Sequence, residues 1–183
     1  IDKNVDSNCC YGDLSAFLII NTPLLARLVT TPGKKIGLIP DFEAKIEQVS
    51  RLIARQKLTS FSGVPSWNLI LMRKVLAETG KKNLHELWPH MELFMHGGVC
   101  FEPYRVHYRE LFPSPDMHYM ETYNASEGFF AFQTDLNDPG LQLLPNVSVF
   151  YEFIPLDKLA AAQNGSFTRF LTLSEVRTDQ PYA

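Results

Sequence analysis

The feature of this sequence that most constrains its fold is a regular alternation of helical and strand patterns between Asp41 and Glu127. Three short runs of mainly apolar and aromatic residues predict buried strands, and helical segments separate them. The predicted strands are Leu58–Ser62, Leu93–His96 and His118–Tyr123. Strands that are joined by helical crossovers pair in parallel, through right-handed connections. The sequence therefore predicts an α/β fold with a mainly parallel sheet and flanking helices.

The helices are predicted from apolar spacing and from their end signals. Asp41 is a suitable N-cap for an amphipathic helix that runs to about Gln56. Ser66 is the expected cap of a second helix ending at Gly80, and Pro103 suits the first turn of a third. An earlier helix is expected over Leu14–Val29, either kinked or split in two by its internal proline.

The C-terminal third of the chain predicts a β meander that extends the sheet. Its expected strands are Phe129–Phe132, Gln142–Leu144 and Val149–Ile154, with proline- and glycine-containing turns between them. A helical turn is expected over Leu156–Ala162, and a frayed start over Ile1–Asp13. The whole chain, residues 1–183, is interpreted as one domain.

Composition narrows the classes of partner. The chain has 183 residues and 45% hydrophobic side chains, enough for one core of ordinary size. A net charge of -3 gives no sign of a nucleic-acid surface, and no apolar run reaches the length of a membrane span. We therefore expect neither nucleic acid nor membrane as a partner. Three cysteines, two of them adjacent, and no signal-peptide pattern favour a reducing, cytoplasmic location.

Three unusual loops leave the carboxyl ends of the three predicted strands. They begin near Gly63, at Gly97-Gly98 and at Tyr123. In open parallel sheets, ligands bind beyond the carboxyl ends of the strands. The sequence therefore predicts a ligand site at this edge.

The loop after the third strand carries the most suggestive chemistry. Within five residues it offers an aromatic face (Tyr123), a hydroxyl (Ser126) and a carboxylate (Glu127). A nucleotide site needs a platform for the base, a donor for a phosphate oxygen and a hard oxygen ligand for magnesium. The alternative is a tight turn in which Ser126 or Asn124 bonds its own backbone and Glu127 is solvated.

Three motifs in this order resemble a known family. They are SGVPSW at Ser62–Trp67, HGGVCFEPYR at His96–Arg105 and YNASEG at Tyr123–Gly128. Together they resemble the Gretchen Hagen family of auxin-responsive acyl acid amido synthetases, in particular its bacterial branch. The resemblance runs from about Gly12 to the end. It implies part of the large N-terminal domain of an adenylate-forming enzyme.

The resemblance implies a two-step reaction that uses ATP and Mg²⁺. A carboxylic acid is activated as an acyl-adenylate and is then transferred to an amino acid or another amine. By the same resemblance, Tyr123 and Asn124 bind the adenine side, Ser126 contacts the α-phosphate and Glu127 holds magnesium. Ser126 and Glu127 are thus the expected catalytic residues.

Further candidates lie in the other two loops. Gly97 and Gly98 are implied to run along the adenine and acyl-adenylate, and the alternative is a tight strand-to-helix turn. Val64, Trp67 and Phe101 are candidates for an acyl pocket, and the alternative for each is a place in the core. His96 adjoins this loop, whereas Arg105 is expected to point to solvent.

Several parts of the family pattern are absent from the sequence: the Ser/Thr/Gly-rich phosphate loop, the ribose-binding aspartate and the small C-terminal domain. We therefore expect a fragment, the middle of the large N-terminal domain, that is inactive by itself. Two other functions remain open. One is an acyl–thioester (CoA-type) ligase with the same adenylation step, and the other is a non-catalytic interaction domain that kept the fold.

Overall fold

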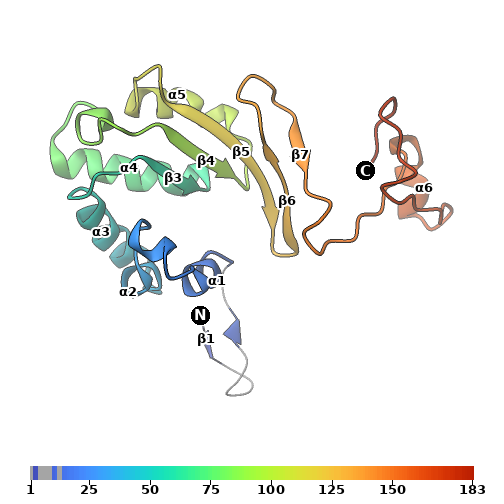
Figure 1. Cartoon of the computed structure of the whole chain (residues 1–183), viewed down its shortest axis with the longest axis horizontal. Helices are drawn as coiled ribbons and strands as arrows, with labels where there is room; N and C mark the ends of the chain where they lie inside the picture. Colours follow the sequence, from blue (N-terminus) through green and yellow to red (C-terminus); the bar gives the residue numbers. More distant parts are fainter. Residues whose placement is uncertain (1, 4–9, 12–13) are drawn as a thin grey trace.

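The centre of the molecule is a five-stranded mixed sheet in the order β3-β4-β5-β6-β7 (Figure 1). The computed structural model describes residues 2–3, 10–11 and 14–183. The strands of this sheet are β3 (Ser60–Gly63), β4 (Leu93–Gly97), β5 (His118–Ala125), β6 (Gly128–Gln133) and β7 (Leu141–Leu143). Strands β3, β4 and β5 are parallel, and β6 and β7 add in antiparallel fashion. The predicted parallel sheet with flanking helices is confirmed.

The helices follow the predicted order along the chain. They are α1 (Leu14–Asn21), η1 (Ala26–Leu28), α2 (Lys34–Gly37), α3 (Phe42–Ile53), α4 (Pro65–Thr79), η2 (Leu84–Glu86), α5 (Glu102–Leu111), η3 (Leu156–Lys158) and α6 (Leu159–Gln163), where η marks a 3₁₀ helix. Asp41 caps α3 as predicted, since its Oδ1 accepts a hydrogen bond from the Ala44 N–H at 2.7 Å. Gly80 ends α4 at a φ of 64°, which favours glycine.

Two prolines decide helix boundaries that the sequence left open or misplaced. Pro23 separates α1 from η1, so the predicted N-terminal helix is split rather than kinked. The predicted cap at Ser66 is wrong, because α4 already begins at Pro65 and Val64 occupies the N-cap position. Proline fits the first turn of a helix because a backbone N–H at that position would have no partner within the helix, so its absence costs nothing.

Only the first part of the predicted C-terminal meander forms. Strands β6 and β7 are present, but no strand covers Val149–Ile154, where a single bridge joins Phe153 to Leu171. The Leu144 N–H donates to the Phe130 carbonyl at 2.8 Å, and Pro145 then has no N–H with which to continue the ladder. Beyond this point an extended segment leads away from the sheet to η3 and α6 (Figure 1).

The expected frayed start can be judged only in part. Strands β1 (Asp2–Lys3) and β2 (Cys10–Tyr11) form a short antiparallel pair. The remainder of that expectation lies outside the described residues. Within the described residues, no helix combines the length and apolar character needed to cross a membrane.

The hydrophobic core lies between one face of the sheet and the helices α4 and α5. Phe61, Phe94 and Tyr119 occupy matching positions on β3, β4 and β5, and the Tyr108 ring of α5 covers all three, with centroid distances of 4.7 to 6.4 Å. Three consecutive parallel strands with right-handed connections place both crossover helices on the same face. The opposite face is more open, and Met95 is exposed there.

Hydrogen bonds from two buried side chains, Trp88 and Tyr108, tie the helical elements to one another. The Trp88 Nε1–H donates to the carbonyls of Ile53 and Gln56 at 3.3 and 3.0 Å, which joins the η2 region to the end of α3. The Tyr108 hydroxyl donates to the Pro65 carbonyl at 2.7 Å, which joins α5 to the first turn of α4. Burial raises the pKa of Tyr108 far above its ordinary value, so this hydroxyl remains a donor.

We expect Tyr108→Phe to lower the free energy of unfolding by about 1 kcal/mol, because it removes one buried hydrogen bond and leaves the packing unchanged. The measurement is a denaturant unfolding curve. Tyr104→Phe on the same helix is the matched control, since no hydrogen bond joins its hydroxyl to the described residues. Equal losses in the two variants would contradict a structural role for the Tyr108–Pro65 bond.

Candidate functional site

The parallel register brings the ends of β3 and β4 to one edge of the sheet. Gly63 is paired with His96, and Gly97 is paired with Thr122. The loops that follow Gly63 and Gly97 therefore leave the same edge, side by side. Strand β5 continues three residues beyond Thr122, to Ala125, so the third loop lies farther out.

At Gly97, the backbone of β4 lies close against Thr122 of β5. A Cβ at this position would collide with the Thr122 carbonyl oxygen and would lie 2.7 Å from the Thr122 Oγ1. The Thr122 hydroxyl itself donates to the His96 carbonyl at 3.0 Å. Glycine is therefore required at position 97 by strand packing alone, which favours the structural interpretation of this residue.

Gly98 has a different reason to be glycine. Its φ is +82°, a left-handed conformation that side chains with a Cβ rarely adopt. A Cβ there would meet only the Val64 Cγ2, at 3.4 Å. Gly98 and Val64, predicted on separate loops, are thus brought together at the sheet edge, with the backbone of Gly98 exposed.

His96 is a buried imidazole directly behind this edge. Its ring stacks on Phe101 at a centroid distance of 4.1 Å, and the Arg105 guanidinium lies 5.0 Å from the centre of the Phe101 ring. Burial, aided by the Arg105 charge, lowers the pKa of His96 to about 4, so the ring is neutral near pH 7. Its Nδ1 is buried and has no hydrogen-bond partner among the described residues.

The predicted loop Asn124–Gly128 is shorter than expected. Asn124 and Ala125 belong to β5 and Gly128 to β6, so only Ser126 and Glu127 form the turn of a β hairpin. The pairing shifts register between Tyr123 and Asn124, which marks a bulge. The turn residues are exposed, and a Cβ on Gly128 would lie 3.0 Å from the Val149 Cγ2.

The structure separates the three groups of the predicted nucleotide motif. Tyr123 is 58% exposed, lies one residue past the Gly97–Thr122 contact and packs against the Phe130 ring at 5.3 Å. At about 3.3 Å per strand residue, Ser126 lies roughly 13 Å beyond Thr122. The aromatic platform is therefore near the glycine loop, whereas the hydroxyl and the carboxylate lie at the hairpin tip.

The three candidates for an acyl pocket have different surroundings. Val64 is half-buried beside Gly98. Trp67 is largely exposed on α4, where it packs edge-on against Phe42 at 4.8 Å. Phe101 is only 3% exposed and its ring contacts His96, so its role as it stands is packing rather than lining an open pocket.

The described residues contain no cluster of three or more histidine, cysteine, aspartate or glutamate side chains that could hold a metal ion. Glu127 stands as a single exposed carboxylate. Magnesium is commonly held by one or two carboxylates together with substrate phosphates. A lone carboxylate fits that chemistry only when a nucleotide supplies the other ligands.

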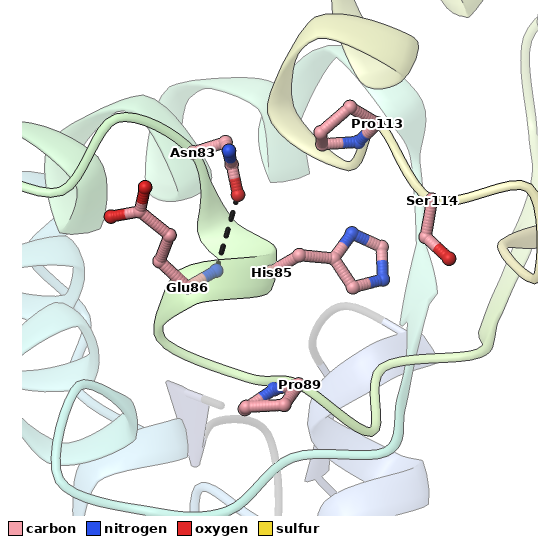
Figure 2. A pocket seen from close by; sticks show the side chains of 6 residues that line it. All are labelled: Asn83, His85, Glu86, Pro89, Pro113 and Ser114. Carbon is pink, nitrogen blue, oxygen red and sulfur yellow. Dashed lines mark hydrogen bonds between the residues drawn. The ribbon is translucent and has the colours of Figure 1, made fainter.

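Two surface hollows lie elsewhere. One, of about 460 Å³, is lined by Asn83, His85, Glu86, Pro89, Pro113 and Ser114 (Figure 2). These residues precede β4 and β5, so this hollow lies toward the amino ends of the strands, opposite the predicted site. The other, of about 520 Å³, lies within the C-terminal segment between Pro155 and Tyr182. Neither includes a residue of the three predicted loops.

Sequence reasoning missed Thr122 as part of this edge. Its hydroxyl and carbonyl both face the Gly97 region, and it directly precedes the aromatic residue of the motif. The strand register, rather than a motif, identifies it, and a sequence read without a register gives no signal for it. Sequence reasoning did note His96, but its burial against Phe101 was not foreseen.

Comparison with known families matches the chain to a family domain. The model of the GH3 family N-terminal domain matches residues 2–117, well over half of the chain. The matched range includes the first two of the three loops and ends just before β5. No curated protein matches the chain.

We expect the free energy of unfolding to fall as the pH is lowered from 6.5 toward 4, by up to about 3 kcal/mol from His96 alone. The sign follows because the unfolded state binds a proton at His96 more readily than the folded state does. The measurement compares unfolding curves across this pH range for the wild type, His96→Phe and the exposed-histidine control His90→Gln. Identical acid sensitivity in the wild type and His96→Phe would contradict the assignment.

We expect Gly97→Ala to destabilise the fold by about 1–3 kcal/mol, because the new methyl group meets backbone atoms of Thr122 that cannot easily move. Gly33→Ala is the matched control, since nothing lies within 4 Å of a Cβ there and its φ is -68°. Thermal unfolding of the two variants measures the difference. A Gly97→Ala variant as stable as Gly33→Ala would show that β4 and β5 can separate at this point.

Proposed function

Since the chain belongs to the GH3 family of ATP-dependent, adenylate-forming acid–amido synthetases, we propose that it forms part of an acyl acid–amino acid ligase. Such an enzyme joins the carboxylate of an acyl acid to the α-phosphate of ATP, with release of pyrophosphate. It then transfers the acyl group to the amine of an amino acid or a similar acceptor. The observation that carries this proposal is the position of Tyr123, exposed and one residue past the Gly97–Thr122 contact, at the edge where the glycine loop ends.

We assign the base-binding role to Tyr123, supported by its exposed ring and by its neighbours. The exposed backbone of Gly98 carries no Cβ, so a flat ligand can lie against it. In this proposal Tyr123 and Gly98 would form two walls around an adenine, and the half-buried Asn124 follows next along β5. Val64 and Trp67 are the residues we propose for the acyl side, and Phe101 is assigned to packing behind them.

Ser126 and Glu127 are proposed to bind the phosphate end of the nucleotide. Both residues are exposed and form the turn at the hairpin tip, so their polar side chains are accessible to a ligand. A spacing of roughly 13 Å from the sheet edge suits the two ends of an extended nucleotide better than two sides of one phosphate. The Ser126 hydroxyl would donate to an α-phosphate oxygen.

Glu127 is the residue that would hold Mg²⁺ together with the nucleotide phosphates. When bound, the ion offsets negative charge that develops on phosphate during transfer. The protein's own contribution is to bind and orient the reactants, because the substrate carboxylate is itself the nucleophile. No protein nucleophile is required by this reaction.

Two other functions are kept as alternatives. An acyl–thioester ligase would use the same adenylation step with a thiol acceptor, and the described residues do not distinguish the two acceptors. A non-catalytic domain is favoured by one observation, namely that Phe101, a candidate for the acyl pocket, is buried against His96. The presence of Tyr123, Ser126 and Glu127 together favours the enzyme.

We also propose that the chain alone binds ATP weakly and does not catalyse carboxylate-dependent pyrophosphate exchange. The family's phosphate loop and ribose-binding aspartate are not found among its residues. Robust exchange by the isolated chain would overturn this part of the proposal without affecting the assignment of Tyr123.

In a protein that contains this chain together with the remaining nucleotide motifs, we expect Tyr123→Ala to raise the KM for ATP about tenfold to a hundredfold. The reason is the loss of an aromatic face under the base. Phe129→Ala is the matched control, because Phe129 is an exposed aromatic residue on the same hairpin. Pyrophosphate-exchange kinetics measure both variants, and an equal effect of the two would remove the case for a base platform at Tyr123.

We expect Glu127→Gln to reduce turnover more than it weakens ATP binding, since the metal acts chiefly on charge in the transition state. The measurement is the same exchange assay with magnesium titrated, and Glu152→Gln, an exposed carboxylate outside the site, is the control. If Glu127→Gln keeps normal turnover and an unchanged magnesium dependence, Glu127 does not bind the metal and the hairpin tip has only a structural role.

A further inference from the structure

The segment from α1 to η1 exposes an unusual amount of aliphatic surface. Leu24, Leu25, Leu28 and Val29 are 75% to 86% exposed, and Leu18 on α1 is also exposed. We call these five residues the aliphatic surface. In Figure 1, α1 and α2 lie below the sheet, beside the N-terminus. Large exposed apolar side chains that gather in one short segment are typical of interaction sites.

The charge around the aliphatic surface is one-sided. Residues 14–40 contain three basic side chains, Arg27, Lys34 and Lys35, and no aspartate or glutamate. The remainder of the chain carries 14 basic and 20 acidic side chains, a net charge of -6. The charged side chains within the segment that carries the aliphatic surface are therefore all positive, which is complementary to an anionic partner.

Polar side chains in this segment are bonded to its own backbone. The Thr22 hydroxyl donates to the Leu18 carbonyl at 2.9 Å, the Thr30 hydroxyl to the Ala26 carbonyl at 2.8 Å and the Arg27 Nε–H to the Thr22 carbonyl at 2.8 Å. Asn21 likewise donates to the Phe17 carbonyl at 2.9 Å. These local bonds lower the cost of bringing the two threonine hydroxyls into an apolar environment, whereas the charged Arg27 head group stays at the polar boundary.

The side-chain types favour lipid over protein as the partner. Energetically dominant residues of protein interfaces are enriched in tryptophan, tyrosine and arginine, whereas leucine and valine are under-represented and lysine is depleted. The aliphatic surface has four leucines and a valine, with two adjacent lysines beside it. Aliphatic side chains that enter the acyl boundary, flanked by lysines and arginine at the headgroups, are typical of proteins that lie on an anionic bilayer.

We propose that the aliphatic surface, with Arg27, Lys34 and Lys35, docks this protein on an anionic membrane surface. The protein lies on the bilayer and does not span it. Sequence reasoning expected no membrane partner, because it considered spanning segments and averaged the charge over the whole chain. The proposal is independent of the ligase function, since none of these residues belongs to the proposed nucleotide or acyl site.

The test is cosedimentation of the chain with vesicles of phosphatidylcholine alone and with vesicles that also contain phosphatidylglycerol. We expect partitioning onto the mixed vesicles only, weakening as salt is raised. Lys34→Gln/Lys35→Gln should lower the affinity for the mixed vesicles about thirtyfold. Each cation contributes about 1 kcal/mol at an anionic surface, and about 1.4 kcal/mol corresponds to a tenfold change in affinity. Leu25→Asp/Leu28→Asp should abolish it.

Matched control variants distinguish docking through the aliphatic surface from nonspecific adsorption to vesicles. Lys81→Gln/Lys82→Gln removes two adjacent exposed lysines elsewhere, and Phe150→Asp changes an apolar residue that is 77% exposed outside the segment. Both should partition as the wild type does, and circular dichroism should show that every variant is folded.

Three results would overturn the proposal. The first is no partitioning onto the mixed vesicles, and the second is partitioning that the lysine and leucine variants leave unchanged. The third is a concentration-dependent dimer in sedimentation without vesicles that Leu25→Asp/Leu28→Asp dissolves, since a second copy would then be the occupant.

Discussion

The close approach of β4 and β5 at Gly97 is the constraint on which the rest of the edge depends. Because Gly97 has no Cβ, the Thr122 carbonyl and hydroxyl can lie directly against the β4 backbone. The Thr122 hydroxyl donates a hydrogen bond to the His96 carbonyl. This contact fixes the register at the end of the parallel ladder. It also determines where the glycine loop leaves the sheet and where Tyr123 emerges.

A second consequence of the parallel ladder is its one-sided core. Because the three parallel strands follow one another in a single direction, α4 and α5 both fall on the same face, and the aromatic rings of Phe61, Phe94 and Tyr108 collect there. His96 lies at the margin of this aromatic cluster. Burial lowers the pKa of its imidazole, which is therefore neutral near pH 7. The loop at this edge is thus stabilised by ring packing against His96 and not by an ion pair with it.

The sequence predicted those parts of the fold that depend on local chemistry. Asp41 as a cap, Gly80 as a helix end and the three parallel strands rest on backbone and side-chain preferences that act over a few residues. The hairpin was mispredicted because small polar residues at Asn124 and Ala125 suggest a loop, whereas pairing with β6 extends the strand. Pairing between strands is a property of two segments, and a single segment does not reveal it.

The same distinction applies to the candidate site. A motif places Tyr123 and Glu127 four residues apart, but only the extended backbone shows that the intervening chain separates them in space. Likewise, Phe101 has the composition of a pocket residue, and only its stacking on His96 shows that the ring is already occupied by protein contacts. Val149–Ile154 is rich in β-branched and aromatic residues, as strands are, but Pro145 ends the ladder before it.

The β5–β6 hairpin acts as a lever anchored at Thr122. A rotation of about ten degrees at its base would displace the tip by about 2 Å, given roughly 13 Å of extended chain. A Cβ on Gly128 would lie 3.0 Å from the Val149 Cγ2, so the Val149 side chain lies close to the hairpin and limits how far it can bend in that direction. Because Tyr123 and Glu127 both follow Thr122, such a rotation moves them together, and what changes is the position of the tip relative to the Gly97–Gly98 loop.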